Sequence, residues 1–304
     1  MKQEIANIIS KIKHRFQITE NFIKATTGTN SQVFVSENFI IKINKNKIDI
    51  KNEHAVIRSL KSVYAPKILG LVSLKGCSVI VEKRIKGQDT QKIWKQLNLK
   101  DKKKIVDNLA DAIFSFHKIR CGYFWSVKTN KKFKSYDQLL LRKFQINRKM
   151  IFNNPTAYNL YLKVKDNLHK STIAKVFKNV KPVLVHGDLI MHNILINENT
   201  LSGIIDWEYA QFGDPFYDLA RVIYYQECAR DYIEQKRDIN FEYDFTTRLI
   251  NQLKKSIKFN SRKYKIIRSL YFIDSIIWAL NSSNPKKNLK KLEPPTLSQL
   301  LGKN

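Results

Sequence analysis

Residues 22 to 85 alternate between apolar and polar side chains over short distances, a pattern typical of β-strands. Three strands are predicted at residues 22–27, 31–36 and 39–43, with a turn near Gly28. Residues 49–60 have apolar side chains at helical spacing and predict a helix, which Asp49 is placed to cap. Residues 68–85 predict two further strands joined by a tight turn.

From residue 101 onward, apolar side chains recur every three or four positions, as in amphipathic helices. Residues 101–119 show this most clearly, with Asp101 as the expected cap. Residues 127–180 are predicted to continue as helices, and helices are expected again from about Pro215 to the end. Residues 183–206 form a β-rich island between the two helical regions.

This order of elements predicts an α+β protein with two lobes. The N-terminal lobe, residues 1–85, is expected to be an antiparallel β-sheet with one main helix. The C-terminal lobe, residues 86–304, is expected to be larger and mainly α-helical. The junction falls near "VEKRIKG", residues 81–87.

Composition places the chain among ordinary globular proteins, with 43% hydrophobic residues, 9 Gly and 7 Pro. Cys77, Cys121 and Cys228 lie far apart and form no CxxC pair, which favours reduced thiols in a cytoplasmic protein. The N-terminal residues 1–16 lack the continuous apolar core of a signal peptide. The most apolar later stretch, residues 269–280, is too short to span a bilayer, so we expect no membrane partner.

The charge is strongly unbalanced, with 55 Lys and Arg against 26 Asp and Glu and a formal net charge of +29. Such a charge could attract nucleic acid, an anionic membrane surface or an acidic substrate. The excess is mostly Lys, however, and the chain is also rich in Asn and Ile. An A+T-rich genome favours all three residues without selection for binding, and we prefer this explanation.

Three oxygen-bearing side chains are predicted to converge within residues 183–220. The apolar runs "ILI" and "LSGII" are separated by "NENT" and therefore predict a hairpin. Asn193 comes just before the first strand and Asp206 just after the second, so the hairpin would bring them together. Asp188 lies five residues before Asn193, across a short loop.

Phosphoryl transfer from a nucleotide needs such a set. One carboxylate orients the attacking hydroxyl and accepts its proton, while a second carboxylate and an amide oxygen hold Mg²⁺ on the phosphates. As an alternative, His186, Asp188 and His192 match the two-His-one-carboxylate set of non-haem iron enzymes. That interpretation leaves Asn193 and Asp206 without a role, and we expect none for His192.

The stretches "HGDLIMHN" and "IDWEYAQFGDPFYDLA" resemble the aminoglycoside phosphotransferase and choline kinase group. The pattern of this group is His-Gly-Asp-x4-Asn, then Ile-Asp-Trp/Phe-Glu and Gly-Asp-Pro-x2-Asp-Leu-Ala. The resemblance implies a bilobal protein-kinase-like fold whose N-terminal lobe binds ATP. It implies that Asp188 is the catalytic base, that Asn193 and Asp206 are Mg²⁺ ligands, and that His186 braces the loop and supports catalysis.

Such kinases hold the nucleotide phosphates with a strand lysine that is paired with a helix glutamate. Lys42 lies in the predicted strand at 39–43. Glu53 shares the apolar stripe of its helix with Ile50 and Ile57, and a carboxylate on a buried face needs a charged partner. Lys42 is therefore its expected partner.

The resemblance also assigns the rest of the cofactor site. The turn "TTGTNSQVF" corresponds to the loop that covers the phosphates, with candidate residues Gly28, Asn30 and Ser31. The segment "VIVEKRIKG" resembles the linker whose backbone binds adenine, and residues 82–85, foremost Glu82 and Arg84, are the candidates.

Four further polar residues near the motif are expected to have no direct chemical role. Asp214 followed by Pro215 predicts a helix N-cap. Asp218 resembles the helix carboxylate that anchors the catalytic loop, and His117 is expected to be a structural histidine. Glu208 is expected to face solvent rather than the metal.

Together these patterns predict a kinase that transfers the γ-phosphate of ATP to a hydroxyl group of a small molecule. Candidate substrates are an amino alcohol such as choline or ethanolamine, thiamine, or an aminoglycoside. "IDWEYA" is closer to the choline, ethanolamine and thiamine branch. The alternative is a kinase-fold protein whose basic surface binds RNA or another anionic macromolecule, with phosphotransfer secondary.

Overall fold

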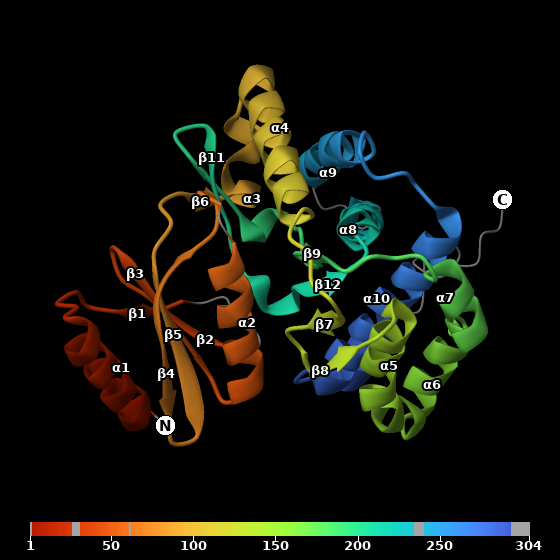
Figure 1. The fold of residues 1–304 in the computed structure, drawn as a ribbon, viewed down its shortest axis with the longest axis horizontal. Coiled ribbons are helices and arrows are strands. Elements are labelled where there is room, and N and C mark those ends of the chain that lie inside the picture. The colour runs from red at the N-terminus through yellow and green to blue at the C-terminus, as the bar shows by residue number, and fades with distance from the viewer. Residues whose placement is uncertain (1, 26–30, 61, 234–239, 293–304) are drawn as a thin grey trace.

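The computed structural model describes residues 2–25, 31–60, 62–233 and 240–292, and these form a bilobal α+β fold (Figure 1). A β-sheet with one helix on each side forms the N-terminal lobe, and most of the helices lie in the other lobe. Helix α2 (Lys47–Ser59) lies between the N-terminal sheet and the rest of the chain. The predicted fold class is confirmed.

The N-terminal lobe contains one five-stranded antiparallel sheet in the order β1-β2-β3-β5-β4. Its other elements are α1 and α2, and in chain order the lobe consists of α1 (Lys2–Phe16), β1 (Ile23–Lys24), β2 (Gln32–Val35), β3 (Phe39–Asn44), α2, β4 (Lys67–Leu74) and β5 (Cys77–Lys83). The main helix and the strands predicted at 31–36, 39–43 and 68–85 are present. Of the strand predicted at 22–27, the structure has Ile23–Lys24, and residues 26 and 27 lie outside the described residues.

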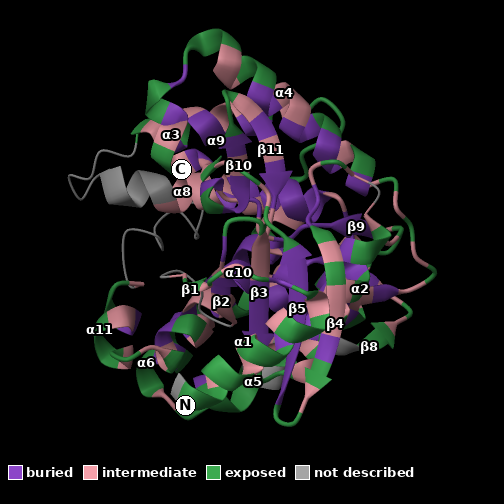
Figure 2. Ribbon diagram, turned by 90° about the vertical axis from the view of Figure 1, so that its left-hand side faces the viewer, coloured by how far each residue is buried: buried purple, intermediate pink, exposed green. Residues whose placement is uncertain are grey.

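Side chains of the interior strands β3 and β5 pack against different helices on the two faces of the sheet. Ile41 pairs with Val81, and this face packs against Ile12 of α1 in an apolar cluster. Because side chains alternate along a strand, Lys42 and its partner Ile80 point to the opposite face, toward α2. Figure 2 shows both strands as buried along most of their length. This register places a lysine in the interior between sheet and helix.

The chain leaves the first sheet after Lys83 and immediately joins the C-terminal lobe. Strand β6 (Gln88–Asp89) pairs with β10 (Ile194–Asn197), which in turn pairs with β11 (Thr200–Ile204). Strand β6 was not predicted, because two residues carry no periodicity of their own. It docks the interlobe segment directly onto the predicted hairpin.

A second sheet in this lobe corrects one prediction. Its order is β8-β7-β12-β9, formed by β7 (Phe124–Ser126), β8 (Thr129–Phe133), β9 (Val183–Val185) and β12 (Gln211–Gly213). The expectation that residues 127–180 are helical throughout is therefore wrong at its start. Strand β8 lies in this range and pairs with β7, which in turn pairs with β12 more than 80 residues later, and no local pattern reports that long-range pairing.

Helices form the rest of the lobe and surround one large apolar core. They are α3 (Thr90–Ile93), α4 (Leu99–Phe116), α5 (Tyr136–Phe152), α6 (Pro155–Leu162), α7 (Lys170–Val176), α8 (Phe216–Ile233), α9 (Asn240–Leu253), α10 (Ser261–Asn281) and α11 (Pro285–Lys290). The described residues also contain four short 3₁₀ helices. Between α-helices lie η1 (Trp94–Gln96) and η2 (Lys165–Leu168), and between strands lie η3 (Met191–Asn193) and η4 (Trp207–Tyr209). No helix within the described ranges is both long and apolar enough to cross a bilayer. The three cysteines are free thiols, as expected.

The two helices with a predicted aspartate cap, α2 and α4, are capped by asparagine instead. The side chain of Asn46 accepts the backbone N–H groups of Ile48 and Asp49, and that of Asn98 accepts the N–H of Asp101. The predicted caps Asp49 and Asp101 are therefore wrong by three positions. Both lie in the first turn instead, where a negative charge interacts favourably with the helix dipole. The predicted cap at Asp214 is confirmed, since its Oδ1 accepts the N–H of Phe216.

Candidate active site

A single buried carboxylate shapes the loop that follows β9. Asp218, in the first turn of α8, accepts the backbone N–H groups of His186 at 3.1 Å and Gly187 at 2.8 Å. His117 Nε2 lies 2.9 Å from the same carboxylate. Gly187 has φ of +79°, and a Cβ there would overlap the carbonyl oxygen of Tyr209. The support roles predicted for Asp218 and His117 are confirmed.

His186 braces this loop with both of its ring nitrogens. Nε2 donates to the carbonyl oxygen of Ile205 at 3.0 Å, and Nδ1 accepts the N–H of Asp188 at 3.2 Å. This pair of contacts requires the neutral ring with its proton on Nε2. The ring also packs on Trp207, with centroids 4.5 Å apart. His186 therefore connects the segments that carry Asp188 and Asp206.

Asp188 is held by partners on both carboxylate oxygens. Arg221 of α8 contacts Oδ1 through Nε at 2.9 Å and through Nη2 at 2.7 Å. Asn193 Nδ2 donates to Oδ2 at 3.0 Å and to the backbone carbonyl of Asp188 at 2.9 Å. These contacts fix the plane of the carboxylate, and Oδ2, which accepts one N–H, keeps a lone pair for another proton.

The β10–β11 hairpin brings Asn193 and Asp206 together as the sequence predicted. Ile194 pairs with Ile204, and the N–H of Ile205 donates to the carbonyl oxygen of Asn193 at 2.9 Å. Asp206 follows with φ of +63° and ψ of +70°, in the left-handed region that aspartate and asparagine tolerate better than most residues. Asp206 therefore lies just after the end of β11, outside the paired residues of the hairpin.

The charges around Asp206 suit a divalent cation. Burial raises the pKa of Asp206; the nearby Lys42 lowers it, and the carboxylates of Glu53 and Asp188 raise it further. A bound cation would reverse this penalty on the ionised form. Asn193 bonds to Asp188 through Nδ2, which leaves its Oδ1 as a candidate neutral oxygen ligand. One carboxylate and one amide oxygen are hard ligands of the kind Mg²⁺ prefers.

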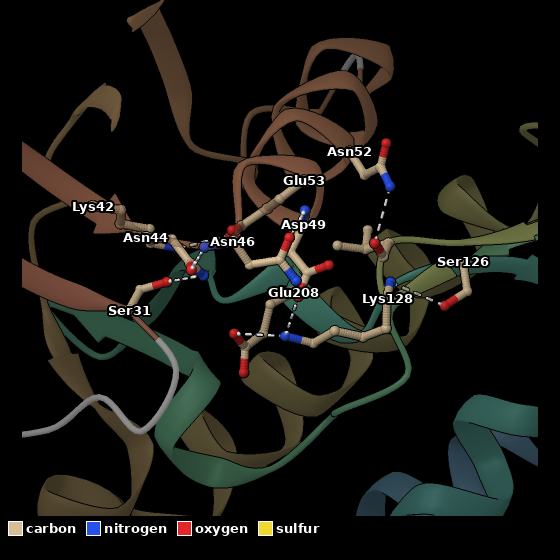
Figure 3. A network of polar contacts seen from close by, with 11 residues as sticks. Ser31, Lys42, Asn44, Asn46, Asp49, Asn52, Glu53, Ser126, Lys128 and Glu208 are labelled. Atoms are coloured by element: carbon tan, nitrogen blue, oxygen red, sulfur yellow. Dashed lines mark hydrogen bonds and ion pairs between the residues drawn. The ribbon is translucent and has the colours of Figure 1, made fainter. Parts of the chain in front are cut away.

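Lys42 and Glu53 form the buried ion pair that the sequence predicted. Lys42 Nζ lies 2.8 Å from Glu53 Oε1, and Figure 3 shows them approaching from the sheet and from α2. Burial alone would lower the pKa of Lys42, but the surrounding carboxylates, foremost Glu53 and Glu82, raise it well above its ordinary value. The ammonium group is therefore charged at every physiological pH.

The remaining predicted cofactor residues have different surroundings. Glu82, in β5, is buried on the face of Lys42, and its Oε2 has no hydrogen-bond partner. Arg84 points elsewhere: its N–H donates to the carbonyl oxygen of Asn38 and its guanidinium to that of Ser36. The backbone N–H and the guanidinium of Arg84 are thus used within the lobe. The backbone groups of its neighbours remain the candidates for binding the adenine base of a nucleotide.

The predicted phosphate-covering turn is only partly described. Gly28 and Asn30 lie outside the described residues. Ser31 Oγ accepts the side-chain N–H of Asn44 at 3.1 Å, and Asn44 Oδ1 accepts the N–H of Asn46 at 2.7 Å. Ser31 therefore ties the end of this turn to the start of α2 (Figure 3).

The buried Glu82 predicts an unusual dependence of stability on pH. Burial raises its pKa from 4.5 to about 7, with Lys42 acting in the opposite direction. Between these two pH values the unfolded chain releases a proton that the folded chain retains, so stability falls as pH rises through this window. Glu82→Gln should therefore have a higher free energy of unfolding than the wild type at pH 8, by up to about 3 kcal/mol, and a similar one at pH 4.

Denaturant unfolding at pH 4, 6 and 8 measures this difference. The exposed Glu37, on the edge of the same lobe, provides the control. Glu37→Gln should follow the wild-type profile at each pH. Parallel profiles for Glu82→Gln and the wild type would show that Glu82 ionises in the folded protein as it does in the unfolded chain.

The structure also bears on the alternative iron site with His186 and His192, and on the position of Glu208. His192 is exposed, and its Nδ1 lies 3.9 Å from Asp89, away from Asp188. Both nitrogens of His186 are engaged, so neither can bind iron. Within the described ranges, no group of three or more His, Cys, Asp or Glu side chains is placed to hold a metal. The expectation that Glu208 faces solvent is wrong: it is buried, 3.3 Å from Lys128.

Sequence reasoning missed Arg221 entirely. Its guanidinium is the charged partner of Asp188 and also lies over the ring of Tyr271. The available signal was its position three residues after Asp218, one helical turn along the same face of α8. Because Arg221 lies one helical turn after Asp218, it reaches the same loop that Asp218 holds.

Comparisons with known proteins bear on the fold and the family. The structure is similar to that of a thermostable mutant of aminoglycoside phosphotransferase APH(4)-Ia in a ternary complex with ADP and hygromycin B (TM-score 0.70, 12% identity, 97% of this chain and 99% of that one). It is also similar to the streptomycin-ATP-APH(2″)-IIa ternary complex (TM-score 0.63, 20% identity, 97% and 98% coverage). No match was found among the curated proteins. The model of the phosphotransferase enzyme family matches residues 26–249.

The matched range includes β3, α2, the loop with Asp188 and the β10–β11 hairpin. It covers well over half of the chain and every described residue of the candidate site. The chain therefore belongs to the phosphotransferase enzyme family.

Proposed function

We propose that the protein is a kinase that transfers the γ-phosphate of ATP to a hydroxyl group of a small molecule. The observation that carries the proposal is the convergence of Asp188, Asn193 and Asp206 at one end of the β10–β11 hairpin. The Lys42–Glu53 pair faces the same space from the N-terminal lobe, as the electrostatic coupling of Lys42 to Asp206 indicates. Membership in a phosphotransferase family supports this assignment.

Each group has a distinct role in this mechanism. Asp188 orients the acceptor hydroxyl and takes its proton, and Arg221 and Asn193 keep the carboxylate in position. Lys42 binds phosphate oxygens of the nucleotide and is itself oriented by Glu53. Asn193 and Asp206 would hold Mg²⁺, which neutralises charge on the phosphates when bound. Catalysis then depends mostly on positioning and electrostatics.

The nucleotide base is assigned to the segment between the lobes. Residues 83–85 lie at and just after the end of β5, and we assign backbone groups of Lys83 and Ile85, on either side of Arg84, to hydrogen bonds with adenine. The turn at residues 26–31 would cover the phosphates from the sheet side. Solved structures with the same fold contain ADP or ATP, which supports a nucleotide in this position.

The acceptor is a small molecule with a free hydroxyl group. Two of the similar structures contain hygromycin B and streptomycin, which supports an aminoglycoside among the candidates. The sequence "IDWEYA" supports the amino alcohols choline and ethanolamine, and thiamine. These compounds differ in size but share a cationic nitrogen and a phosphorylatable hydroxyl.

ATP consumption by the purified protein tests the proposal. A coupled assay with Mg²⁺ should show ADP release stimulated at least about 10-fold by one class among amino alcohols, thiamine, aminoglycosides and sugars, with a phosphorylated product visible by mass spectrometry. Removal of Mg²⁺ by a chelator should abolish the stimulation. Failure of every acceptor to stimulate turnover, with ATP bound, would contradict a small-molecule kinase.

The nucleic-acid alternative rests on the net charge of +29. It predicts retention of RNA that weakens steeply between 50 and 200 mM salt, since each neutralised phosphate adds to the salt dependence. RNA retention without acceptor-stimulated ATP consumption would favour this alternative over the kinase.

A further inference from the structure

A lysine of the C-terminal lobe joins α2 to the segment that follows Asp206. The Lys128 ammonium nitrogen lies 3.5 Å from Asp49 Oδ2 in α2 and 3.3 Å from Glu208 Oε2 in η4. It also lies over the ring of Tyr209, 5.1 Å from the centroid. Figure 3 shows the long Lys128 side chain reaching from the β7–β8 turn to both carboxylates. One cation therefore contacts both lobes.

Backbone groups of the same turn strengthen this connection. Asn52 Nδ2, in α2, donates to the carbonyl oxygen of Val127 at 3.0 Å. The N–H of Val127 donates to the carbonyl oxygen of Ala210 at 3.0 Å. Ser126 Oγ accepts the N–H of Lys128 at 3.2 Å and fixes the turn itself. Residues 126–128, which we call the strap, are thus bonded to α2 on one side and to residues 208–210 on the other.

The burial of these charges makes Lys128 hard to replace. The side chains of Asp49 and Glu208 are only 16% and 12% exposed, and that of Lys128 is 23% exposed. Burial raises the pKa of Asp49, while Lys128 lowers it. Without the ammonium group, two poorly solvated carboxylates would face each other across the boundary between the lobes, and they would repel each other.

The two carboxylates lie next to the two halves of the site. Asp49 and Glu53 are four residues apart and therefore share one face of α2, and Glu53 holds Lys42. Glu208 follows Asp206 by two residues in the same turn. Resting on the proposed function, we propose that Lys128 is a positioning residue that keeps the Lys42–Glu53 pair aligned with Asp206 for phosphoryl transfer.

Kinetics of Lys128 variants test this role. Lys128→Met keeps the length of the side chain and removes its charge, and we expect kcat to fall about 10- to 100-fold with little change in KM for the acceptor, since small misplacements can have effects of this size. Lys128→Arg keeps a cation that can contact two carboxylates and should retain most of the activity. Lys131→Met, an exposed lysine on the same hairpin, is the matched control and should behave like the wild type.

A double-mutant cycle with Asp49→Asn separates positioning from general loosening of the fold. If Lys128 acts through Asp49, the double variant Lys128→Met/Asp49→Asn should have a kcat no lower than that of Lys128→Met alone, since asparagine removes one of the two facing carboxylates, and the melting temperatures should not follow the kcat values. Additive losses in kcat, wild-type kcat for Lys128→Met, or equal losses for Lys128→Met and Lys128→Arg would each overturn the proposal.

Amide hydrogen exchange of the protein without nucleotide provides a second readout that needs no activity. Lys128→Met should increase exchange in α2 and in residues 205–210 together, while Lys131→Met should not. Increased exchange confined to the β7–β8 hairpin would show that the strap does not hold the two lobes together and would overturn the proposal. If the wild type consumed no ATP with any acceptor, the proposed function would fail, and the exchange pattern would still decide whether Lys128 joins the lobes.

Discussion

Asp188→Asn is expected to lower kcat for acceptor-dependent ATP consumption by about 10²- to 10⁴-fold, the range by which a positioned general base accelerates proton transfer. Asparagine preserves the size of the side chain, its amide oxygen can still accept from Arg221, and Asn193 keeps its hydrogen bond to the backbone carbonyl at this position, so the loop should keep its shape. It cannot take a proton from a hydroxyl. The KM for ATP should change little, since in the proposed mechanism Asp188 contacts the acceptor and not the nucleotide.

A histidine in the same loop provides the control. His192 lies four residues after Asp188 with its side chain 56% exposed, and His192→Asn should keep kcat within about twofold of the wild type because a surface change away from special contacts has little effect. Steady-state kinetics and the melting temperature should be measured for both variants. Equal losses for the two would mean that the loop as a whole, and not the Asp188 carboxylate, supports turnover. Full activity of Asp188→Asn would remove it as the base.

Residues whose roles are set by local spacing could be predicted from the sequence. The hairpin places Asn193 beside Asp206 because strand pairing follows from a short turn between two apolar runs. Glu53 was paired with Lys42 because a carboxylate on an apolar helical stripe needs a cation, and the 2.8 Å contact confirms it. Both predictions needed only elements that are close together in the sequence and their periodicity.

Residues whose roles are set by tertiary packing could not be predicted. The chain has 55 Lys and Arg, and its local pattern does not tell which of them contacts a given carboxylate. Arg221 reaches Asp188 only because α8 is docked through Asp218 onto the loop. Lys128 reaches Glu208 only because β7 pairs with β12. In each case a contact between distant segments selects one cation from many.

The large net charge does not describe the interior of the site. Glu53, Glu82 and Asp206 all lie close enough to Lys42 to raise its pKa, so carboxylates outnumber this cation locally. A site of this kind favours metal ions and cationic groups even within a chain of net charge +29. A chain of high positive charge is expected to repel cationic acceptors. The carboxylates around Lys42 make this repulsion weaker at the site than the composition suggests.

Asp206→Asn is expected to lower kcat by about 10³-fold or more and to make the metal-free protein more stable. The loss of activity follows from removing the only carboxylate of the proposed Mg²⁺ ligand pair. The gain in stability follows because burial raises the pKa of Asp206 above its ordinary value, so the ionised side chain destabilises the folded protein at neutral pH. Asparagine removes this penalty and tolerates the φ of +63°, whereas alanine would add backbone strain.

Denaturant unfolding with and without Mg²⁺ distinguishes the two effects. In the presence of a chelator, Asp206→Asn should exceed the wild type by about 1 kcal/mol, the size of a typical stabilising substitution. Mg²⁺ at ten times its Kd should stabilise the wild type by about 1.4 kcal/mol and leave Asp206→Asn unchanged, because only a site that binds the ion gains from it. Asp111→Asn, at an exposed position of α4, should alter neither value. If Asp206→Asn were less stable than the wild type in the chelator, the carboxylate would be stabilising without a cation, and Lys42 rather than Mg²⁺ would be its partner.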